Sequence, residues 1–427
     1  MKNNFKSLLI ALTCFTSVET SAQFSTLYAG MWHPESVISD GKFLYVTDIG
    51  RELNPLAKDS DGAIRKFSLD GNLIEANLSK EPLNAPKGTA IIKNVLYVAD
   101  LERIVGIDIA SGNKISTIDF SSFGVHLIND IAVKNDTVLF ASSTDLNKIF
   151  QISLGKSQRI IELNIPEIKG ANGVCYDTKN NRLYIVGLGS FNSAKGEGEI
   201  GYIDWKKNKP EYFKFPNITG FFDGIELVAA NNIIVSDWVN LAKAEGVLKK
   251  INVNTGVVTT LTNEPLGGPA DFYFDSKINQ LIIPATQQGR LLRLSLSGAQ
   301  PNLSRYEIGF KKYEQIKKEN ADKHLQFLTE ISPALAKQII ENAYGEVYTD
   351  IKLDMKTIEI AVIAALTAKG NAEPQLKVHI NEALNFGCTT QDIKDLFQLM
   401  TLYCGIPNAI NGLTILKDVE KERSIKK

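Results

Sequence analysis

Two polar residues on neighbouring helical segments have the side chains that proton transfer needs. Glu359 lies inside the apolar segment 356–369, and His379 lies on the next segment, 373–386, on one face with Leu376. A buried carboxyl group has a raised pKa, and a histidine beside it forms a coupled acid and base. The alternative is that Glu359 points to solvent and His379 is a hydrogen-bonded core residue, and spacing alone favours that alternative.

A second set of polar residues recurs just before six strand-like segments in the first two-thirds of the chain. The set includes Glu35, Asn129, Asp130, Asn172 and Asp223. If the strands that follow converge on one axis, their carboxylate and amide oxygens suit a hard divalent cation such as Ca²⁺. The alternative is that the Asn-Gly and Asp-Gly pairs at these positions only form turns.

The strands that position this second set repeat with a period of about 40–50 residues. Six strand-like pentads each follow a turn-rich segment, and they are Leu44–Asp48, Leu96–Asp100, Leu139–Ser143, Leu183–Gly187, Ile233–Asp237 and Leu281–Ala285. Four short strands per period are typical of a β-propeller. The pattern predicts six blades, with Phe24–Tyr28 closing the ring against the last blade. Two β-sandwiches are the alternative, and the long period argues against them.

After the last repeat the alternating pattern gives way to helical periodicity. Residues 298–303 read as a polar linker, and Ser304 with Glu307 has the spacing of a capping box that begins a helix. The predicted fold class is therefore multi-domain, with an all-β six-bladed propeller over residues 23–297 followed by an all-α domain over residues 304–427. Segment 356–369 is apolar nearly all round, so it must be buried inside the domain or at a subunit interface.

The first 22 residues read as a secretory signal peptide. Lys2 and Lys6 precede a short apolar stretch, and Thr20-Ser21-Ala22 offers small residues for cleavage. The stretch is too short to span a bilayer, which needs about 20 apolar residues. We therefore expect an exported protein, periplasmic or extracellular, without a membrane span; a buried first helix is the alternative.

The composition excludes several classes of protein. The 47 basic and 48 acidic residues give a net charge of −1, so no basic surplus exists to bind nucleic acid or an anionic membrane. Four histidines and four cysteines are too few for a zinc-finger array or a disulfide scaffold.

Over about residues 30–297 the sequence resembles the senescence-marker-protein and gluconolactonase family of six-bladed propellers. The resemblance rests on Glu35, Asn129-Asp130, Asn172-Gly173 and Asp223-Gly224. It implies that Glu35, Asn172 and Asp223 hold one divalent metal, Ca²⁺ or Zn²⁺, and that Asn129 and Asp130 face the substrate. Such a metal polarises a lactone carbonyl or activates water, and Asp223 then also serves as base. Pro34-Glu35-Ser36 departs from the family's usual Glu-Gly-Pro.

From about Arg305 to the end, the sequence is similar to carboxymuconolactone decarboxylase-like proteins. The matching stretches are Tyr344–Tyr348, Lys356–Glu359, His379–Gly387 and Tyr403–Ala409. The resemblance implies an all-α bundle that forms trimers or hexamers and decarboxylates a carboxylated γ-lactone without metal or organic cofactor. It also implies that His379 and Glu359 transfer protons.

The same superfamily includes alkyl-hydroperoxidase D-like thiol enzymes, which place a Cys-x-x-Cys pair about four residues before the histidine. Here that stretch is Ala372–Gln375, which has no thiol, so a peroxidase would lack its usual nucleophile. We interpret Cys404, which lies elsewhere, as a packing residue.

Together the resemblances predict an exported two-domain enzyme that acts on small lactones or carboxylated organic molecules. It would be a decarboxylase-like lyase, with metal-dependent lactone hydrolysis in the propeller, and a homo-oligomer through its helical domain. One alternative is a non-catalytic propeller that binds a ligand or partner and is oligomerised by the helical domain. Another is a peroxidase-like activity without the usual cysteine pair.

Overall fold

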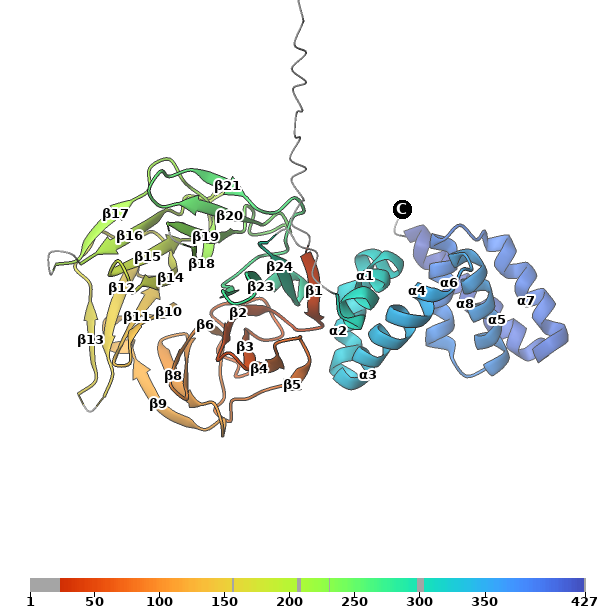
Figure 1. Cartoon of the computed structure of the whole chain (residues 1–427). Coiled ribbons are helices and arrows are strands. Elements are labelled where there is room, and N and C mark those ends of the chain that lie inside the picture. Colours follow the sequence, from red (N-terminus) through yellow and green to blue (C-terminus); the bar gives the residue numbers. More distant parts are fainter. Residues whose placement is uncertain (1–23, 156, 206–208, 230, 298–302, 426–427) are drawn as a thin grey trace, which may run out of the picture. The chain divides into compact units, whose positions relative to one another are not determined.

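The computed structural model describes residues 24–155, 157–205, 209–229, 231–297 and 303–425 (Figure 1). The chain divides into two compact units between Asn302 and Leu303. The first unit contains the strands and the second contains the long helices. The predicted signal peptide and residues 298–302 of the predicted linker lie outside the described residues.

The first unit is a six-bladed propeller of four-stranded antiparallel sheets, as predicted. Blade 1 consists of β2 (Pro34–Ser39), β3 (Phe43–Asp48), β4 (Ala63–Ser68) and β5 (Leu73–Glu75). Blade 2 consists of β6 (Pro86–Ile92), β7 (Val95–Asp100), β8 (Arg103–Asp108) and β9 (Lys114–Asp119). Blade 3 consists of β10 (Ile128–Asn135), β11 (Val138–Ser143), β12 (Lys148–Ser153) and β13 (Arg159–Glu162). Blade 4 consists of β14 (Ala171–Asp177), β15 (Arg182–Gly187), β16 (Ile200–Asp204) and β17 (Glu211–Lys214). Blade 5 consists of β18 (Phe222–Ala229), β19 (Asn232–Asp237), β20 (Val247–Asn252) and β21 (Val258–Thr260). Blade 6 consists of β22 (Tyr273–Asp275), β23 (Gln280–Ala285), β24 (Arg290–Ser295) and β1 (Phe24–Ala29).

Each predicted pentad is the second strand of its blade. These strands are buried on both faces, as the run Leu183–Val186 of β15 illustrates. Side chains from neighbouring blades share apolar clusters, and Tyr45 of β3 lies in one cluster with Leu96 of β7. Burial on both faces is the reason why the pentads are almost continuously apolar instead of alternating.

The ring closes through strands from the two ends of the unit. β1 pairs antiparallel with β24, and Phe24 lies opposite Leu294 in the register. The prediction that Phe24–Tyr28 completes the last blade is confirmed. All six first strands can therefore surround one central channel.

The second unit is all-helical, as predicted. Its elements are α1 (Arg305–Lys317), the 3₁₀ turn η3 (Lys318–Asn320), α2 (Ala321–Ile331), α3 (Pro333–Gln338), the π-helical segment η4 (Ile339–Val347), α4 (Tyr348–Asp350), α5 (Met355–Lys369), α6 (Glu373–Asn385), α7 (Thr390–Cys404) and α8 (Ile406–Ile425). The Ser304–Glu307 capping box forms with both of its hydrogen bonds. Gly370 ends α5 with a φ of +76°, which glycine adopts without strain.

The apolar core of this unit combines residues of α5, α6, α7 and α8, including Ile363, Ile380, Phe397 and Leu416. Helix α5 turns only part of its apolar surface toward this core, and Ala361 on its other side is exposed. The sequence predicted that this helix is buried either inside the domain or at a subunit interface. The helical unit alone buries one face of α5. Among the described residues, no helix combines the length and hydropathy that a membrane crossing requires.

Candidate functional site

Glu359 and His379 meet between helices α5 and α6. Glu359 is fully buried, and His379 keeps about 20% of its side chain exposed. The distance between His379 Nδ1 and Glu359 Oε2 is 2.8 Å, which is that of a hydrogen bond. The alternative in which Glu359 points to solvent is therefore wrong.

This hydrogen bond assigns different roles to the two imidazole nitrogens. Because Nδ1 faces a carboxylate, it carries a proton, and Nε2 is the atom through which the ring can exchange a proton with a bound molecule. Glu359 Oε1 is buried and has no hydrogen-bond partner among the described residues. Buried polar atoms without partners are uncommon in folded proteins.

A second carboxylate, which the sequence pattern did not single out, faces the same imidazole nitrogen. Glu382 Oε2 lies 3.5 Å from His379 Nδ1, and Lys317 of α1 forms a buried ion pair with Glu382. Burial raises the pKa of Glu382, and the Lys317 ammonium opposes that rise. Glu382 follows His379 by three residues, so the two side chains share one face of α6. This spacing could have been recognised in the sequence. No sequence period connects Lys317 to Glu382.

The cluster has the ligand types of a metal site. One ligand atom each from Glu359, His379 and Glu382 lies within 4.8 Å of the others. Lys317, however, already places a positive charge against Glu382, which disfavours a cation there. The expectation of no metal in this domain stays a prediction.

Aromatic residues and a second histidine surround the cluster. Tyr313 Oη and His324 Nδ1 are 2.7 Å apart. Burial, together with the charges of Lys317 and His379, lowers the pKa of His324 to about 4. Burial raises the pKa of Tyr348 to about 12. His324 and Tyr348 are therefore neutral near pH 7, and they can donate or accept hydrogen bonds there without titrating.

The cysteines of the helical unit lie in different environments. Cys388 is buried in the apolar core, and burial raises the pKa of its thiol. Cys404 Sγ donates a hydrogen bond to the Met400 carbonyl oxygen at 3.2 Å. Burial of Cys388 works against the lowered pKa of a reactive thiol, which weighs against a role for Cys388 in the peroxidase alternative.

Four of the five polar residues predicted for the propeller share one cavity. Glu35 on β2, Asn129 on β10, Asn172 on β14 and Asp223 on β18 line a space of about 240 Å³, here named the first cavity. They come together because they stand at the starts of the innermost strands of four blades.

The three predicted metal ligands each contribute an oxygen that lacks a partner. Glu35 Oε2, Asn172 Oδ1 and Asp223 Oδ1 are buried without a hydrogen bond among the described residues. Trp238 Nε1 donates to the other Asp223 oxygen, Oδ2, at 2.8 Å. Burial raises the pKa of Asp223 to about 7 and that of Glu35 well above its usual range. Unpaired buried oxygens of this kind fit the ligand preference of a divalent cation such as Ca²⁺.

Lys87 also lines the first cavity, although the sequence pattern did not single it out. It lies on β6 with 1% of its surface exposed. Its Nζ donates to the carbonyl oxygens of Pro55 and Ala85, each at 2.7 Å. Burial lowers the pKa of Lys87 to about 8, while Glu35 and nearby aspartates oppose that shift.

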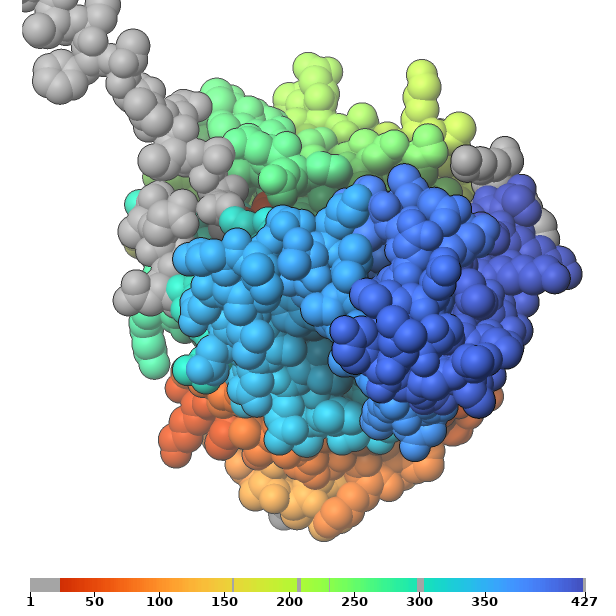
Figure 2. All heavy atoms as spheres, turned by 90° about the vertical axis from the view of Figure 1, so that its right-hand side faces the viewer, coloured from red at the N-terminus to blue at the C-terminus, as the bar shows by residue number. Residues whose placement is uncertain are grey.

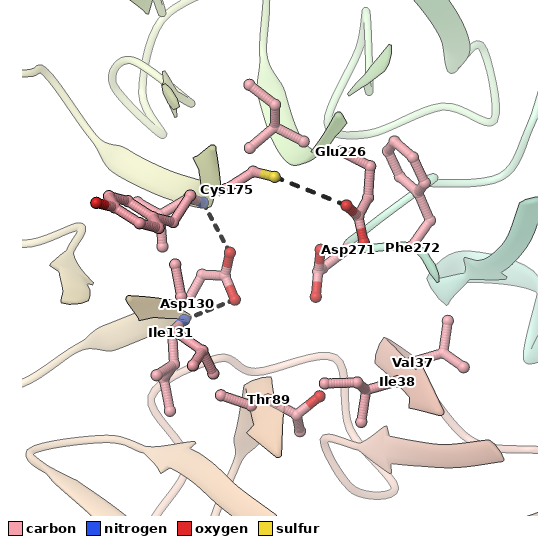
Figure 3. Close-up of a pocket in the computed structure, with 15 residues that line it drawn as sticks. Val37, Ile38, Thr89, Asp130, Ile131, Cys175, Glu226, Asp271 and Phe272 are labelled. Atoms are coloured by element: carbon pink, nitrogen blue, oxygen red, sulfur yellow. Dashed lines mark hydrogen bonds between the residues drawn. The ribbon is translucent and has the colours of Figure 1, made fainter. Parts of the chain in front are cut away.

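Asp130 does not face the first cavity. Its carboxylate accepts hydrogen bonds from the backbone N–H groups of Ile131 and Val174, each at 2.7 Å, and it lines another space, the second cavity (Figure 3). Asn129 lines the first cavity and Asp130 the second, at a place where the register of β10 with β11 is irregular between Ile128 and Ile131. The expectation that both face the same substrate is corrected for Asp130.

The second cavity gathers carboxyl groups from three blades and a thiol from a fourth (Figure 3). Asp130 and Asp271 face one another across it, and Cys175 Sγ lies 3.7 Å from Glu226 Oε2. Burial raises the pKa of Glu226 to about 8 and that of Asp271 to about 7. Ser36 Oγ donates to Asp271 at 2.6 Å. Burial thus favours the protonated forms of these carboxyl groups near neutral pH.

Comparison with known proteins separates the two units. Residues 333–418 match the model of the carboxymuconolactone decarboxylase family. A 4-carboxymuconolactone decarboxylase from Acinetobacter baylyi is 27% identical over 122 residues, which are 28% of this chain and 90% of that protein. An uncharacterised 15.0 kDa protein from Paracoccus denitrificans is 28% identical over 99 residues, which are 23% of this chain and 74% of that protein. The matched range includes Glu359, His379 and Glu382 but not Lys317.

Solved structures with similarity to the chain cover the propeller. An inactive virginiamycin B lyase from Staphylococcus aureus has 16% identity and a TM-score of 0.46, over 65% of this chain and 99% of that one. A luciferin-regenerating enzyme has 13% identity and a TM-score of 0.45, over 64% of this chain and 95% of that one. The propeller assignment itself rests on the strand pairing.

Proposed function

We propose that this chain, whose residues 333–418 are a domain of the carboxymuconolactone decarboxylase family, is an exported two-domain enzyme for small lactones or related carboxylated molecules. The observation that carries the proposal is the buried hydrogen bond between Glu359 and His379. A carboxylate that holds one imidazole nitrogen orients the ring and stabilises its protonated form. A pair with only a structural role does not require an exposed imidazole, whereas about 20% of the His379 side chain is exposed.

In the helical unit the proposed reaction is decarboxylation followed by protonation. The bond between the substrate's carboxylate carbon and its neighbouring carbon breaks, and CO₂ leaves. The electron pair left on the neighbouring carbon then takes a proton from His379. Glu359 orients the imidazole and stabilises its charge before the transfer, and solvent returns the proton to the ring afterwards.

In the propeller, Glu35, Asn172 and Asp223 would hold a divalent cation through their three unpartnered oxygens. Such an ion, when bound, supplies Lewis-acid chemistry at a carbonyl oxygen. Trp238 holds Asp223 in place through its indole N–H, and Asn129 offers an amide to the substrate. Hydrolysis would join a water oxygen to the lactone carbon, break the ring C–O bond and pass the proton of water to the leaving oxygen.

The two proposed activities can be separated by assaying CO₂ release and loss of lactone-ring absorbance on the full chain. We expect His379→Ala to lower the rate of CO₂ release by a factor of about 10²–10⁴ and to leave ring opening intact. Asp223→Ala should have the opposite effect, because it removes a ligand in the other unit. If both variants match the wild type on every lactone that the wild type converts, these assignments are wrong.

Divalent cation binding is expected to stabilise the propeller. At a Ca²⁺ concentration 100 times its Kd, binding to the native state adds about 2.7 kcal/mol, or roughly 5 °C in Tm for a unit of this size. Differential scanning calorimetry with Ca²⁺ or Zn²⁺ measures the shift. Asp223→Asn should remove it, whereas Asp271→Asn in the second cavity should keep it. No shift with either ion, and no metal by elemental analysis, would contradict the metal proposal.

The stability of the metal-free propeller should fall as pH rises from about 4 to 7. Burial raises the folded-state pKa of Asp223 to about 7, so the folded state holds a proton that the unfolded chain loses near pH 4. The folded state thus binds more protons, and deprotonation favours unfolding. Chemical denaturation at several pH values, with EDTA or with Ca²⁺, tests this. Ca²⁺ should flatten the dependence, because it stabilises the ionised carboxylate.

We also propose that the helical unit forms the homo-oligomer, as a trimer or hexamer. Large apolar side chains are exposed where α7 meets α8, with 80% of Leu402, 77% of Tyr403 and 63% of Ile406 accessible. The side of the unit that carries α7 faces the viewer in Figure 2. Contiguous apolar surface of this kind is typical of protein contacts.

Light scattering after size-exclusion chromatography tests the oligomer. We expect the double variant Leu402→Ser/Ile406→Ser to lower the molar mass to that of a single chain. Ile74→Ser, which removes an apolar side chain that is 55% exposed on the propeller, serves as the control and should leave the mass unchanged. A wild-type chain that is monomeric at micromolar concentration would contradict the proposal.

A further inference from the structure

The first cavity joins a polar floor to an extended apolar wall. The wall residues come mainly from loops between the second and third strands of blades 1, 4 and 5, and they are Ile49, Leu53, Pro55, Leu127, Leu188, Phe191, Trp238 and Leu241. Leu53 and Phe191 are about half exposed. A molecule in this cavity thus meets mostly hydrocarbon from these loops, together with the Thr286 hydroxyl, and polar groups from the starts of the innermost strands.

Lys87 gives the floor its single positive charge. Two of its three ammonium protons go to the backbone carbonyls of Pro55 and Ala85. The third is left for a ligand in the cavity that Lys87 lines. The two carbonyls also fix the position of Nζ, so a ligand oxygen meets a donor that needs no rearrangement.

The charges of the floor depend on whether the three unpartnered oxygens hold a cation. Glu35 and Asp223, when ionised, outweigh Lys87 and leave the floor with a net charge of −1. A bound divalent ion reverses this to +1. The floor then attracts an anionic group. Without Lys87 the two carboxylates and the cation would have a net charge of zero, so Lys87 supplies this attraction.

We propose that the first cavity selects lactones and esters with an apolar substituent, and that Lys87 binds the carbonyl oxygen and then the carboxylate of the ring-opened product. This inference rests on the proposed hydrolysis in the propeller and names its substrate class. Hydrolysis converts the carbonyl group into a carboxylate at the floor. The same Lys87 N–H therefore binds the carbonyl oxygen of the substrate and a carboxylate oxygen of the product. The apolar wall holds the substituent throughout.

A polyhydroxylated lactone such as a sugar lactone does not suit this wall. Each hydroxyl that enters an apolar environment without a hydrogen bond loses the hydrogen bonds that it makes in water, and this weakens binding. From these loops only two polar side chains line the cavity among the described residues, and both already donate: the Trp238 indole N–H to Asp223 and the Thr286 hydroxyl to the Pro34 carbonyl oxygen. The same wall gains from every methylene group that it covers.

Isothermal titration calorimetry on the full chain with saturating Ca²⁺ tests the inference through product-like probes. The probes are octanoate, gluconate and octylammonium. We expect octanoate to bind at least tenfold more tightly than either of the others. Lys87→Met, which keeps the length of the side chain and removes its charge, should weaken octanoate binding roughly 10- to 100-fold, the worth of one charge-assisted hydrogen bond.

Two further variants separate the floor from the wall. Leu53→Ser/Phe191→Ser should weaken octanoate binding and leave the binding of butyrate unchanged, because butyrate does not reach the mouth. Asp271→Asn in the second cavity is the control and should bind octanoate as the wild type does. These variants and the wild-type probe series do not depend on whether Lys87→Met folds.

The possible results distinguish failure of this inference from failure of the proposed function. If Ca²⁺ binds but octanoate and gluconate bind equally, or Lys87→Met binds octanoate like the wild type, the substrate class is wrong and the metal site stands. If Ca²⁺ does not bind, the metal proposal is wrong. Octanoate binding that survives EDTA and is lost in Lys87→Met would uphold the role of Lys87 without a metal.

Discussion

Replacing Lys317 with methionine is expected to lower the free energy of unfolding of the helical unit by about 3–5 kcal/mol. Lys317 and Glu382 are both more than nine-tenths buried, and they form an ion pair between α1 and α6. The variant removes one partner and leaves the carboxyl of Glu382 in a low-dielectric environment. A buried charge without its partner costs far more than the pair itself contributes.

The double variant Lys317→Met/Glu382→Gln is the matched comparison, because it removes both charges. We expect it to recover most of the loss, since replacing a whole buried ion pair is often neutral. Chemical denaturation of the full chain, followed by helical circular dichroism, measures both variants. Lys356→Met, which breaks the partly exposed pair with Asp392, should cost no more than about 1 kcal/mol. Equal stability of Lys317→Met and the wild type would show that the pair does not form.

The second large effect is expected on catalysis. His379→Ala should lower the rate of CO₂ release by a factor of about 10²–10⁴, which is the usual contribution of a positioned general acid or base. Glu359→Gln keeps the shape of the side chain but removes the negative charge beside Nδ1. It should lower the rate by a similar factor if the stabilised imidazolium is the proton donor.

Lys377→Ala is the control for both variants, because Lys377 lies on the same helix as His379 and forms an ion pair with exposed Glu422. We expect it to match the wild type. Loss of rate in His379→Ala with no change in Glu359→Gln would assign proton transfer to the histidine alone. Retention of the full rate in His379→Ala would overturn the assignment.

The propeller could be predicted because the same strand pattern recurs in each of its six blades. Six pentads at a similar spacing report the same buried second strand, so an error at one blade is corrected by the others. Helix starts were also predictable, because Ser304 and Glu307 satisfy the first turn by local hydrogen bonds. The spacing of Glu359 and His379 alone favoured a solvent-exposed Glu359, and only the resemblance to carboxymuconolactone decarboxylase-like proteins predicted that the two residues act together.

The residues that escaped prediction act through contacts that no local pattern encodes. Lys317 and Glu382 are 65 positions apart, and only the packing of α1 brings them together. Lys87 stands in an unremarkable Pro-Lys-Gly stretch, and its burial depends on the Pro55 loop of the neighbouring blade. Asp130 was misplaced because the register of β10 with β11 is irregular between Ile128 and Ile131, and no local sequence pattern indicates which way a side chain points there.

The pairing of β1 with β24 also bears on how the chain reaches its fold. The last blade takes its strands from both ends of the unit, so the ring cannot close until almost the whole propeller sequence is available. Contacts between such distant segments form slowly, and until they form, β24 presents an unpaired edge that can bind other chains. Loss of Phe24–Ala29 by proteolysis would leave that edge open permanently. We therefore expect the extreme N-terminal strand to govern the solubility of the whole protein.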